Sequence, residues 1–197
     1  MSFDPAAYGP KIAPLITDRL PELGPGAPNT AMRSQLQSLT IENAFAGKTV
    51  ADHAAARCCL AALWLWLWHD FLDESHAISQ EIETIDGSYW HAIMHRREPD
   101  YGNAKYWFRR VPRHPILEQL TVVAKELASP AQLDEPAAFL SEQSTWDPFR
   151  FVDLCEAIAR GRSRSEQLAR EIARAEWQLL FEHCYRQAVG QASRLPR

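Results

Sequence analysis

Three features that would point to a membrane protein or a sheet protein are missing from the sequence. The most apolar segment, residues 54–68, contains Arg57 and falls short of the roughly 20 apolar residues that a membrane-spanning helix needs. Residues 1–11 have neither a basic start nor an apolar run, so we expect no signal peptide. No stretch shows the sustained alternation of apolar and polar residues that marks a half-buried strand. We therefore expect a protein without a sheet and without a membrane partner.

The sequence also lacks a metal-type cysteine motif and a strong charge of one sign. Its four cysteines show no C-x-x-C spacing, since Cys58 and Cys59 are adjacent and Cys155 and Cys184 stand alone in apolar surroundings. Buried free thiols in a reducing compartment explain this usage, so we expect a cytoplasmic protein. The net charge of −4 gives no whole-chain reason to expect nucleic acid or an anionic membrane as a partner.

The composition is that of a globular protein with one domain. The chain has 197 residues, of which 46 % are hydrophobic and 23 % charged, and this is enough to bury a core. Residues 1–30 hold six prolines and three glycines with little periodicity. Proline fixes φ and removes a hydrogen-bond donor, so we expect a proline-rich, extended arm rather than a packed element. Residues 31–197 are predicted to form a single helical domain.

Helical periodicity and helix signals continue through residues 31–197. They predict an all-α domain of packed helical hairpins with about seven to eight helices, arranged either like tetratricopeptide repeats or as an irregular bundle. The expected boundaries are a start at Thr49 with Asp52 before the apolar run 54–68, a turn at residues 86–88, a helix end before Pro99, and a capping box of Ser163 with Glu166 that opens a helix running to Gly190.

A weak internal repeat favours the tetratricopeptide-like alternative. In residues 88–115, small, aromatic and proline residues fall close to the positions they occupy in such a hairpin: Ala92, Ala104, Phe108, Val111 and Pro115. An earlier helical hairpin, roughly residues 51–82, aligns with it and has HDFLD at its turn. Two degenerate units are fewer than the three or so that a stable solenoid needs. The repeat therefore describes packing and names no partner.

Histidine and carboxylate residues occur twice with the same spacing. His69, Asp73 and His76 stand at i, i+4 and i+7, and His91, His95 and Glu98 repeat this pattern. Such ligands suit zinc, iron or manganese, so we name His69, Asp73, His76, His91 and His95 as candidate metal ligands. The pair most certain to share a helix face is His91 with His95, because Pro99 disfavours helix at Glu98. In a common cleft, His91, His95 and Glu98 are also candidates for acid–base catalysis.

Basic and aromatic residues are interleaved immediately after these histidines. Nucleic acid is a poor fit, because the aromatic residues of 101–108 at helical spacing cannot all face solvent. A small anion such as phosphate or carboxylate needs fewer exposed side chains, and arginine grips such groups in a bidentate way. The candidate ligand-binding residues are Arg96, Arg97, Asp100, Tyr101, Asn103 and Lys105. Glu98 and Asp100 are also available as local ion-pair partners for Arg96 and Arg97.

Residues 69–115 resemble the signature of an uncharacterised family of bacterial and fungal proteins. The resemblance rests on the block HRRE-x-D-Y-x-N-A-K-Y-W-F-R-R, and the later WDPFRFVDLCEA at residues 146–157 fits the same family. Pro112 departs from the glycine expected there. The resemblance covers about a third of the chain, and it implies that the polar block is important without naming its chemistry.

Two hypotheses for function follow, and whether the protein is an enzyme stays open. In the first, residues 69–76 and 91–105 meet in a pocket that binds a small anion or a divalent metal, with hydrolytic chemistry as one outcome. In its small-ligand form, this hypothesis requires His91, His95 and Arg97 to open onto a concave pocket. In the second, the chain is a tetratricopeptide-like interaction module without catalytic activity, and the polar block stabilises a hairpin turn.

Overall fold

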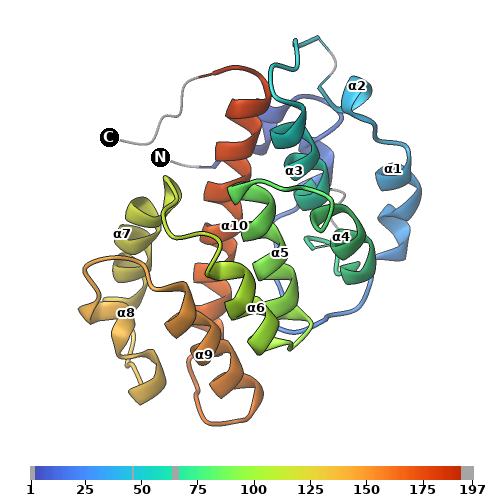
Figure 1. The fold of residues 1–197 in the computed structure, drawn as a ribbon. Helices are drawn as coiled ribbons and strands as arrows, with labels where there is room; N and C mark the ends of the chain where they lie inside the picture. Colours follow the sequence, from blue (N-terminus) through green and yellow to red (C-terminus); the bar gives the residue numbers. More distant parts are fainter. Residues whose placement is uncertain (1–2, 46, 64–66, 192–197) are drawn as a thin grey trace.

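The computed structural model describes residues 3–45, 47–63 and 67–191, and this part of the chain contains helices and no strand (Figure 1). The prediction of an all-α protein is therefore confirmed. The α-helices are α1 (Arg33–Gln37), α2 (Ile41–Ala44), α3 (His53–Leu63), α4 (Leu72–Ser79), α5 (Ile85–Arg97), α6 (Tyr101–Phe108), α7 (Ile116–Ala128), α8 (Phe139–Glu142), α9 (Pro148–Ala159) and α10 (Glu166–Ala188). Short 3-10 helices are η1 (Pro5–Tyr8), η2 (Ala13–Leu15), η3 (Thr30–Met32) and η4 (Glu135–Ala137).

Helix α10 runs through the middle of the molecule, and the other long helices surround it (Figure 1). It packs against α3 on one side and against α7 on another, while α5 packs between α4 and α6. One apolar core joins the N-terminal segment, α3, α5 and the C-terminal half of α10. A second core joins α7, α9 and the N-terminal half of α10. Polar side chains of α5 consequently lie at the junction of several helices.

Proline and glycine signals predicted two helix ends correctly. Helix α5 ends at Arg97, just before Pro99, and α6 begins after Asp100, whose carboxylate accepts the backbone N–H of Asn103. At the other end of the chain, Gly190 follows α10 with a positive φ of 65°, as a residue after a helix C-terminus often does. The sequence HRREPDY is therefore the turn of the α5–α6 hairpin.

Other helix boundaries differ from the predictions. The described residues hold ten α-helices rather than seven to eight, because α2 and α8 are helices of only four residues, too short for a periodic pattern. Residues 86–88 lie inside the first turn of α5 rather than in a turn, since Thr84 caps that helix. Ser163 forms no capping box, because its hydroxyl donates to Asp134 instead. Helix α3 starts after Asp52, which accepts the N–H of Ala55, and residues 64–66 of the predicted apolar run lie outside the described residues.

The prediction of an unpacked N-terminal arm is wrong. Tyr8, Ile12 and Leu15 are 0–3 % exposed and belong to the same core as α3 and α10. Prolines leave the backbone carbonyls of this segment without a helical partner, and side chains elsewhere supply the donors: Arg170 donates to the carbonyls of Leu20 and Pro21. The proline-rich segment is thus extended in places and still part of the core.

The tetratricopeptide-like arrangement stays a prediction. The two expected hairpins are present as α3–α4 and α5–α6, and Ala92, Ala104 and Phe108 are buried as the repeat pattern requires. Hairpin packing of this kind also occurs in irregular bundles. Within the described ranges, no helix combines the length and the apolar character that crossing a bilayer requires.

Candidate functional site

Three histidines from two helices meet beside the α5–α6 hairpin. His91 and His95 are one turn apart on α5, and His76 reaches them from α4. One nitrogen of each ring lies within 4.8 Å of one nitrogen of each of the other two. The ring centroid of His76 is 4.9 Å from that of His91 and 5.1 Å from that of His95. We call His76, His91 and His95 the histidine cluster.

The hydrogen bonds of the cluster leave one fully buried histidine without a partner. Nδ1 of His95 lies 3.0 Å from Oε2 of Glu98, and Nε2 of His95 lies 3.1 Å from the side-chain amide of Asn103. In the described part of the chain, neither ring nitrogen of His91 has a hydrogen-bond partner, although this side chain is only 2 % exposed. A buried polar group without a partner costs about 1–3 kcal/mol, so His91 is poised to gain from a ligand.

Burial favours the uncharged form of His91 and of His95. The pKa of His91 is lowered to about 3, mainly by desolvation and further by the nearby His95, His76 and Arg110. Desolvation also lowers the pKa of His95, although Glu98 opposes this effect. A neutral imidazole keeps a lone pair on one nitrogen, and this is the form that binds a metal ion.

An aromatic ring and an arginine lie next to the cluster. The ring of Trp107, on α6, stacks on His91 with a centroid distance of 4.0 Å and an interplanar angle of 18°. The guanidinium of Arg110 lies over the same indole, 4.8 Å from its centroid. His76 and Trp107 are half-buried and Arg110 is exposed, so the cluster lies close to the protein surface.

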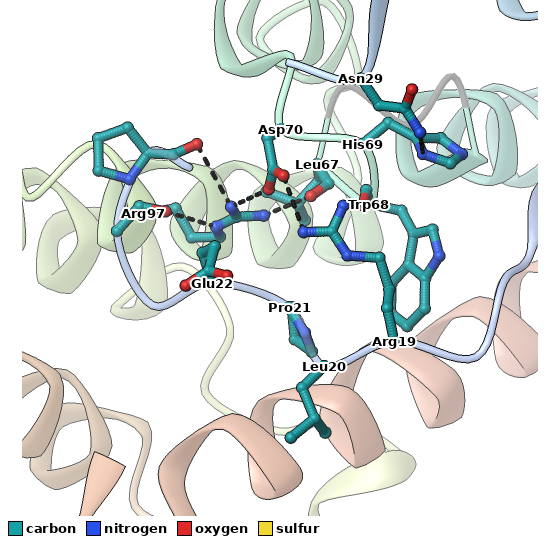
Figure 2. A network of polar contacts seen from close by, with 12 residues as sticks. Arg19, Leu20, Pro21, Glu22, Asn29, Leu67, Trp68, His69, Asp70 and Arg97 are labelled. Carbon is teal, nitrogen blue, oxygen red and sulfur yellow. Dashed lines mark hydrogen bonds and ion pairs between the residues drawn. The ribbon is translucent and has the colours of Figure 1, made fainter. Parts of the chain in front are cut away.

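Two of the predicted metal ligands lie outside the cluster. Nε2 of His69 is 3.1 Å from the carbonyl of Leu15, and its Nδ1 faces Asn29 (Figure 2). Asp73 is exposed in the first turn of α4. The reason is the turn at residues 67–70, which precedes α4 and places His69 and His76 on different sides of the chain. Of the three candidates in the 69–76 segment, the structure places only His76 beside α5.

Arg96 forms a buried ion pair with a residue of α10. Its Nη2 lies 2.5 Å from Oε2 of Glu176 on α10, and both side chains are at most 2 % exposed. Tyr89 donates its hydroxyl to the other carboxylate oxygen of Glu176, at 3.1 Å. The expected local partners Glu98 and Asp100 serve His95 and the N-terminus of α6 instead. Arg96 is therefore committed to a buried ion pair.

Arg97 is likewise committed to an internal network (Figure 2). It pairs with Asp70 at 2.5 Å and donates to the backbone carbonyls of Leu67 and Gly24. Arg19, from the N-terminal segment, donates to the second carboxylate oxygen of Asp70 at 2.8 Å. We call Arg19, Asp70 and Arg97 the arginine–aspartate network. Arg97 is thus paired with Asp70, whereas the rings of His91 and His95 stack on each other with 4.6 Å between their centroids. The small-ligand pocket around these three residues stays a prediction.

The remaining predicted ligand residues also have internal contacts. Lys105 forms an ion pair with Asp153, Asn103 contacts His95, and Tyr101 is half-buried against both cores. Asp100 caps α6. The predicted ligand-binding residues therefore lie in a region that is rich in polar contacts. Most of them make contacts that hold helices together.

A second polar cluster was not predicted from the sequence. Nε2 of His114 lies 2.7 Å from Oδ1 of Asp86, and Nε2 of His183 lies 3.4 Å from the same oxygen. Asp86 is in the first turn of α5, His114 precedes α7, and His183 is on α10. Asp86 and His114 are 28 residues apart. No local spacing in the sequence signals this contact.

The hydrogen bonds of this second cluster argue against a metal. The backbone N–H of Ile116 donates to Nδ1 of His114 at 3.3 Å, so the ring proton is on Nε2 and is donated to Asp86. A metal on Nε2 would move the ring proton to Nδ1. The N–H at Nδ1 would then face the backbone N–H of Ile116, and two donors cannot form a hydrogen bond. Burial opposes ionisation of Asp86, but the hydrogen bonds of His114 and His183 hold its pKa below the usual value. We interpret this cluster as a link between three helices.

Because several histidines are buried, we expect the protein to lose stability in mild acid. Burial lowers the pKa of His69 and of His114, despite the Leu15 carbonyl and Asp86, so the unfolded chain binds protons more readily below about pH 6.5. The free energy of unfolding therefore falls as the pH falls, by up to about 1.4 kcal/mol per pH unit for each such histidine. His91 and His95 act in the same direction. We expect urea unfolding with chelator present to show a loss of about 2 kcal/mol or more between pH 7.5 and pH 5.

Two variants test the origin of this pH dependence, and a third serves as the control. His114→Gln and His69→Gln each remove one buried titrating group, so each is expected to reduce the slope of unfolding free energy against pH. His53→Gln changes an exposed histidine and is expected to leave the slope unchanged. Equal free energies of unfolding at the two pH values would contradict the prediction.

Comparisons with known proteins do not assign the chain to a family. The resemblance of residues 69–115 to a bacterial and fungal family stays a prediction. A scan against protein-family models, a search of curated proteins and a search of solved structures each find no match.

Proposed function

We propose that the protein binds a divalent transition metal, of the class of zinc, through His76, His91 and His95. The observation that carries the proposal is the burial of His91 with both ring nitrogens unpartnered, beside two further imidazoles that lie within 4.8 Å. A metal ion needs no concave pocket and fits between side chains that are too close for a larger ligand. It would also give the buried nitrogen of His91 the partner that it lacks.

The surroundings of His95 support this proposal. Glu98 accepts a hydrogen bond from one ring nitrogen of His95, as carboxylates do beside metal-bound histidines, and this fixes the proton on Nδ1. The lone pair is then on Nε2, where the Asn103 amide would have to give way to a metal ion. Three protein ligands and a free coordination position are typical of catalytic zinc sites, so hydrolytic activity is the first activity to test.

Metal binding is tested on protein freed of metal with a chelator and then titrated with zinc, manganese or iron. We expect one zinc ion per chain, and zinc at 100 times its dissociation constant should stabilise the fold by about 2.7 kcal/mol, or roughly 5–10 °C in Tm. His91→Phe keeps a flat ring against Trp107 but removes both nitrogens, so its zinc affinity should fall by about 100-fold or more. Glu98→Gln should lower the affinity about 10–100-fold.

His53→Ala is the matched control, because His53 is exposed at the start of α3 and is not one of the three clustered histidines. It should bind zinc like the unaltered protein. If purified protein contains no metal by elemental analysis and none of the three metals shifts its Tm, the proposal is wrong. It is equally wrong if His91→Phe binds zinc with unaltered affinity.

A further inference from the structure

A metal on the histidine cluster would be a site of uncompensated positive charge. Three neutral imidazoles leave both charges of a divalent ion in place, and Glu98 is placed to bind His95 rather than the ion. Such a centre completes its coordination with an anion or with a water molecule of lowered pKa. The first question is therefore which protein group stands next to that free position.

Arg110 is an exposed cation that is linked to the cluster through Trp107. Its guanidinium lies over the Trp107 ring, which itself stacks on His91. Among the described residues, Arg110 is exposed and has no carboxylate within ion-pair distance. Arg96, Arg97 and Lys105 are committed to Glu176, Asp70 and Asp153.

We propose that the metal-loaded site binds a small oxyanion, a carboxylate or a phosphate, with one oxygen on the metal and another on the guanidinium of Arg110. This inference rests on the proposed metal site. Arginine suits the role because its planar fork binds two oxygens of one anion, and its stacking on Trp107 limits the orientations that the fork can take. The recognised chemical class is the same whether the anion is a free ion or the end of a larger substrate.

Arg109 provides a matched control for Arg110. It is the preceding residue, is also exposed, and lies over Tyr106 rather than Trp107, with 5.8 Å between its guanidinium carbon and the ring centroid. Both substitutions remove one positive charge from the same end of α6. A difference between Arg110→Gln and Arg109→Gln therefore reports the position of the charge rather than the net charge of the protein.

The experiment uses the full chain loaded with cobalt(II), whose visible absorption reports the ligands of the metal. Acetate and inorganic phosphate are titrated separately into the unaltered protein, Arg110→Gln and Arg109→Gln. We expect both anions to change the cobalt spectrum, with a dissociation constant at least tenfold higher in Arg110→Gln and within about twofold in Arg109→Gln. Cobalt affinity itself should be similar in all three proteins.

The outcomes separate the two proposals. If cobalt does not bind the unaltered protein, the proposed metal site fails and the anion site fails with it. If cobalt binds but neither anion changes its spectrum, or if both variants bind the anions equally, only the anion inference is overturned. Equal anion affinity with and without cobalt also overturns it, because the anion would then not be held by the metal.

Discussion

Replacing Glu176 by alanine is expected to lower the free energy of unfolding by about 3–5 kcal/mol. The carboxylate of Glu176 is fully buried and faces Arg96, whose side chain is 2 % exposed. Burial disfavours a charged Arg96, but Glu176 holds the pKa of this guanidinium above its ordinary value, so the arginine stays charged. In the described part of the chain, Nη1 of Arg96 has no hydrogen-bond partner. Without Glu176, a buried positive charge is left uncompensated.

Urea unfolding at pH 7.5 measures this loss, and three variants resolve its cause. Glu176→Gln removes the charge but keeps an acceptor for the Tyr89 hydroxyl, so most of the loss should remain. Asp153→Ala breaks the solvent-exposed pair with Lys105 and should cost less than about 1 kcal/mol. Changing both Arg96 and Glu176 to leucine removes the stranded charge and should recover much of the stability. A loss in Glu176→Ala no larger than in Asp153→Ala would contradict the prediction.

Replacing Asp70 by alanine is expected to cost a similar 3–5 kcal/mol. Arg97 would lose its carboxylate partner while remaining 3 % exposed, and the carbonyls that it also contacts carry no full charge. Asp70 has a positive φ of 64°, a conformation that costs alanine roughly 1–2 kcal/mol. Loss of charge and backbone strain therefore act together.

Four further variants separate these contributions in urea unfolding. Asp70→Asn tolerates the left-handed backbone, so it reports the loss of charge alone. Arg19→Ala removes the more exposed partner of Asp70 and should cost less than about 1 kcal/mol. Gly26→Ala would place a Cβ 2.6 Å from Cγ of Asp70, whereas Gly47→Ala, also at positive φ, meets no atom within 4 Å. If Gly26→Ala and Gly47→Ala cost the same, the arginine–aspartate network is less tightly packed than the structure implies.

Local signals predicted the hairpin that carries the candidate site. Pro99 marked the end of α5, and the i, i+4 spacing of His91 and His95 placed both rings on one helix face. His76 was one of three candidates for a further ligand in the 69–76 segment. Selecting it required the turn at residues 67–70, because that turn decides which side of the chain meets α5. Sequence spacing therefore predicts contacts within one helix more reliably than contacts across a turn.

Long-range partners were not predictable from one sequence. Arg96 and Glu176 are 80 residues apart, and Arg97 and Asp70 are 27 apart, whereas Glu98 and Asp100 are close in sequence. Adjacent helical residues point about 100° apart, so the arginines turn toward α10 and the 67–70 turn rather than toward their neighbours. The partner of a buried charge is the residue that helix packing places next to it. Local sequence spacing does not reveal that residue.

The N-terminal segment packs against α10, which is synthesised near the end of the chain. Tyr8 hydrogen-bonds to Glu182, 174 residues later, so it leaves the ribosome long before its partner exists. At 5–20 residues per second, the wait is roughly 10–35 s, during which the core that holds Ile12 and Leu15 lacks its α10 residues. Prolines disfavour strand pairing between neighbouring chains. The six prolines of residues 1–30 disfavour such pairing during this interval.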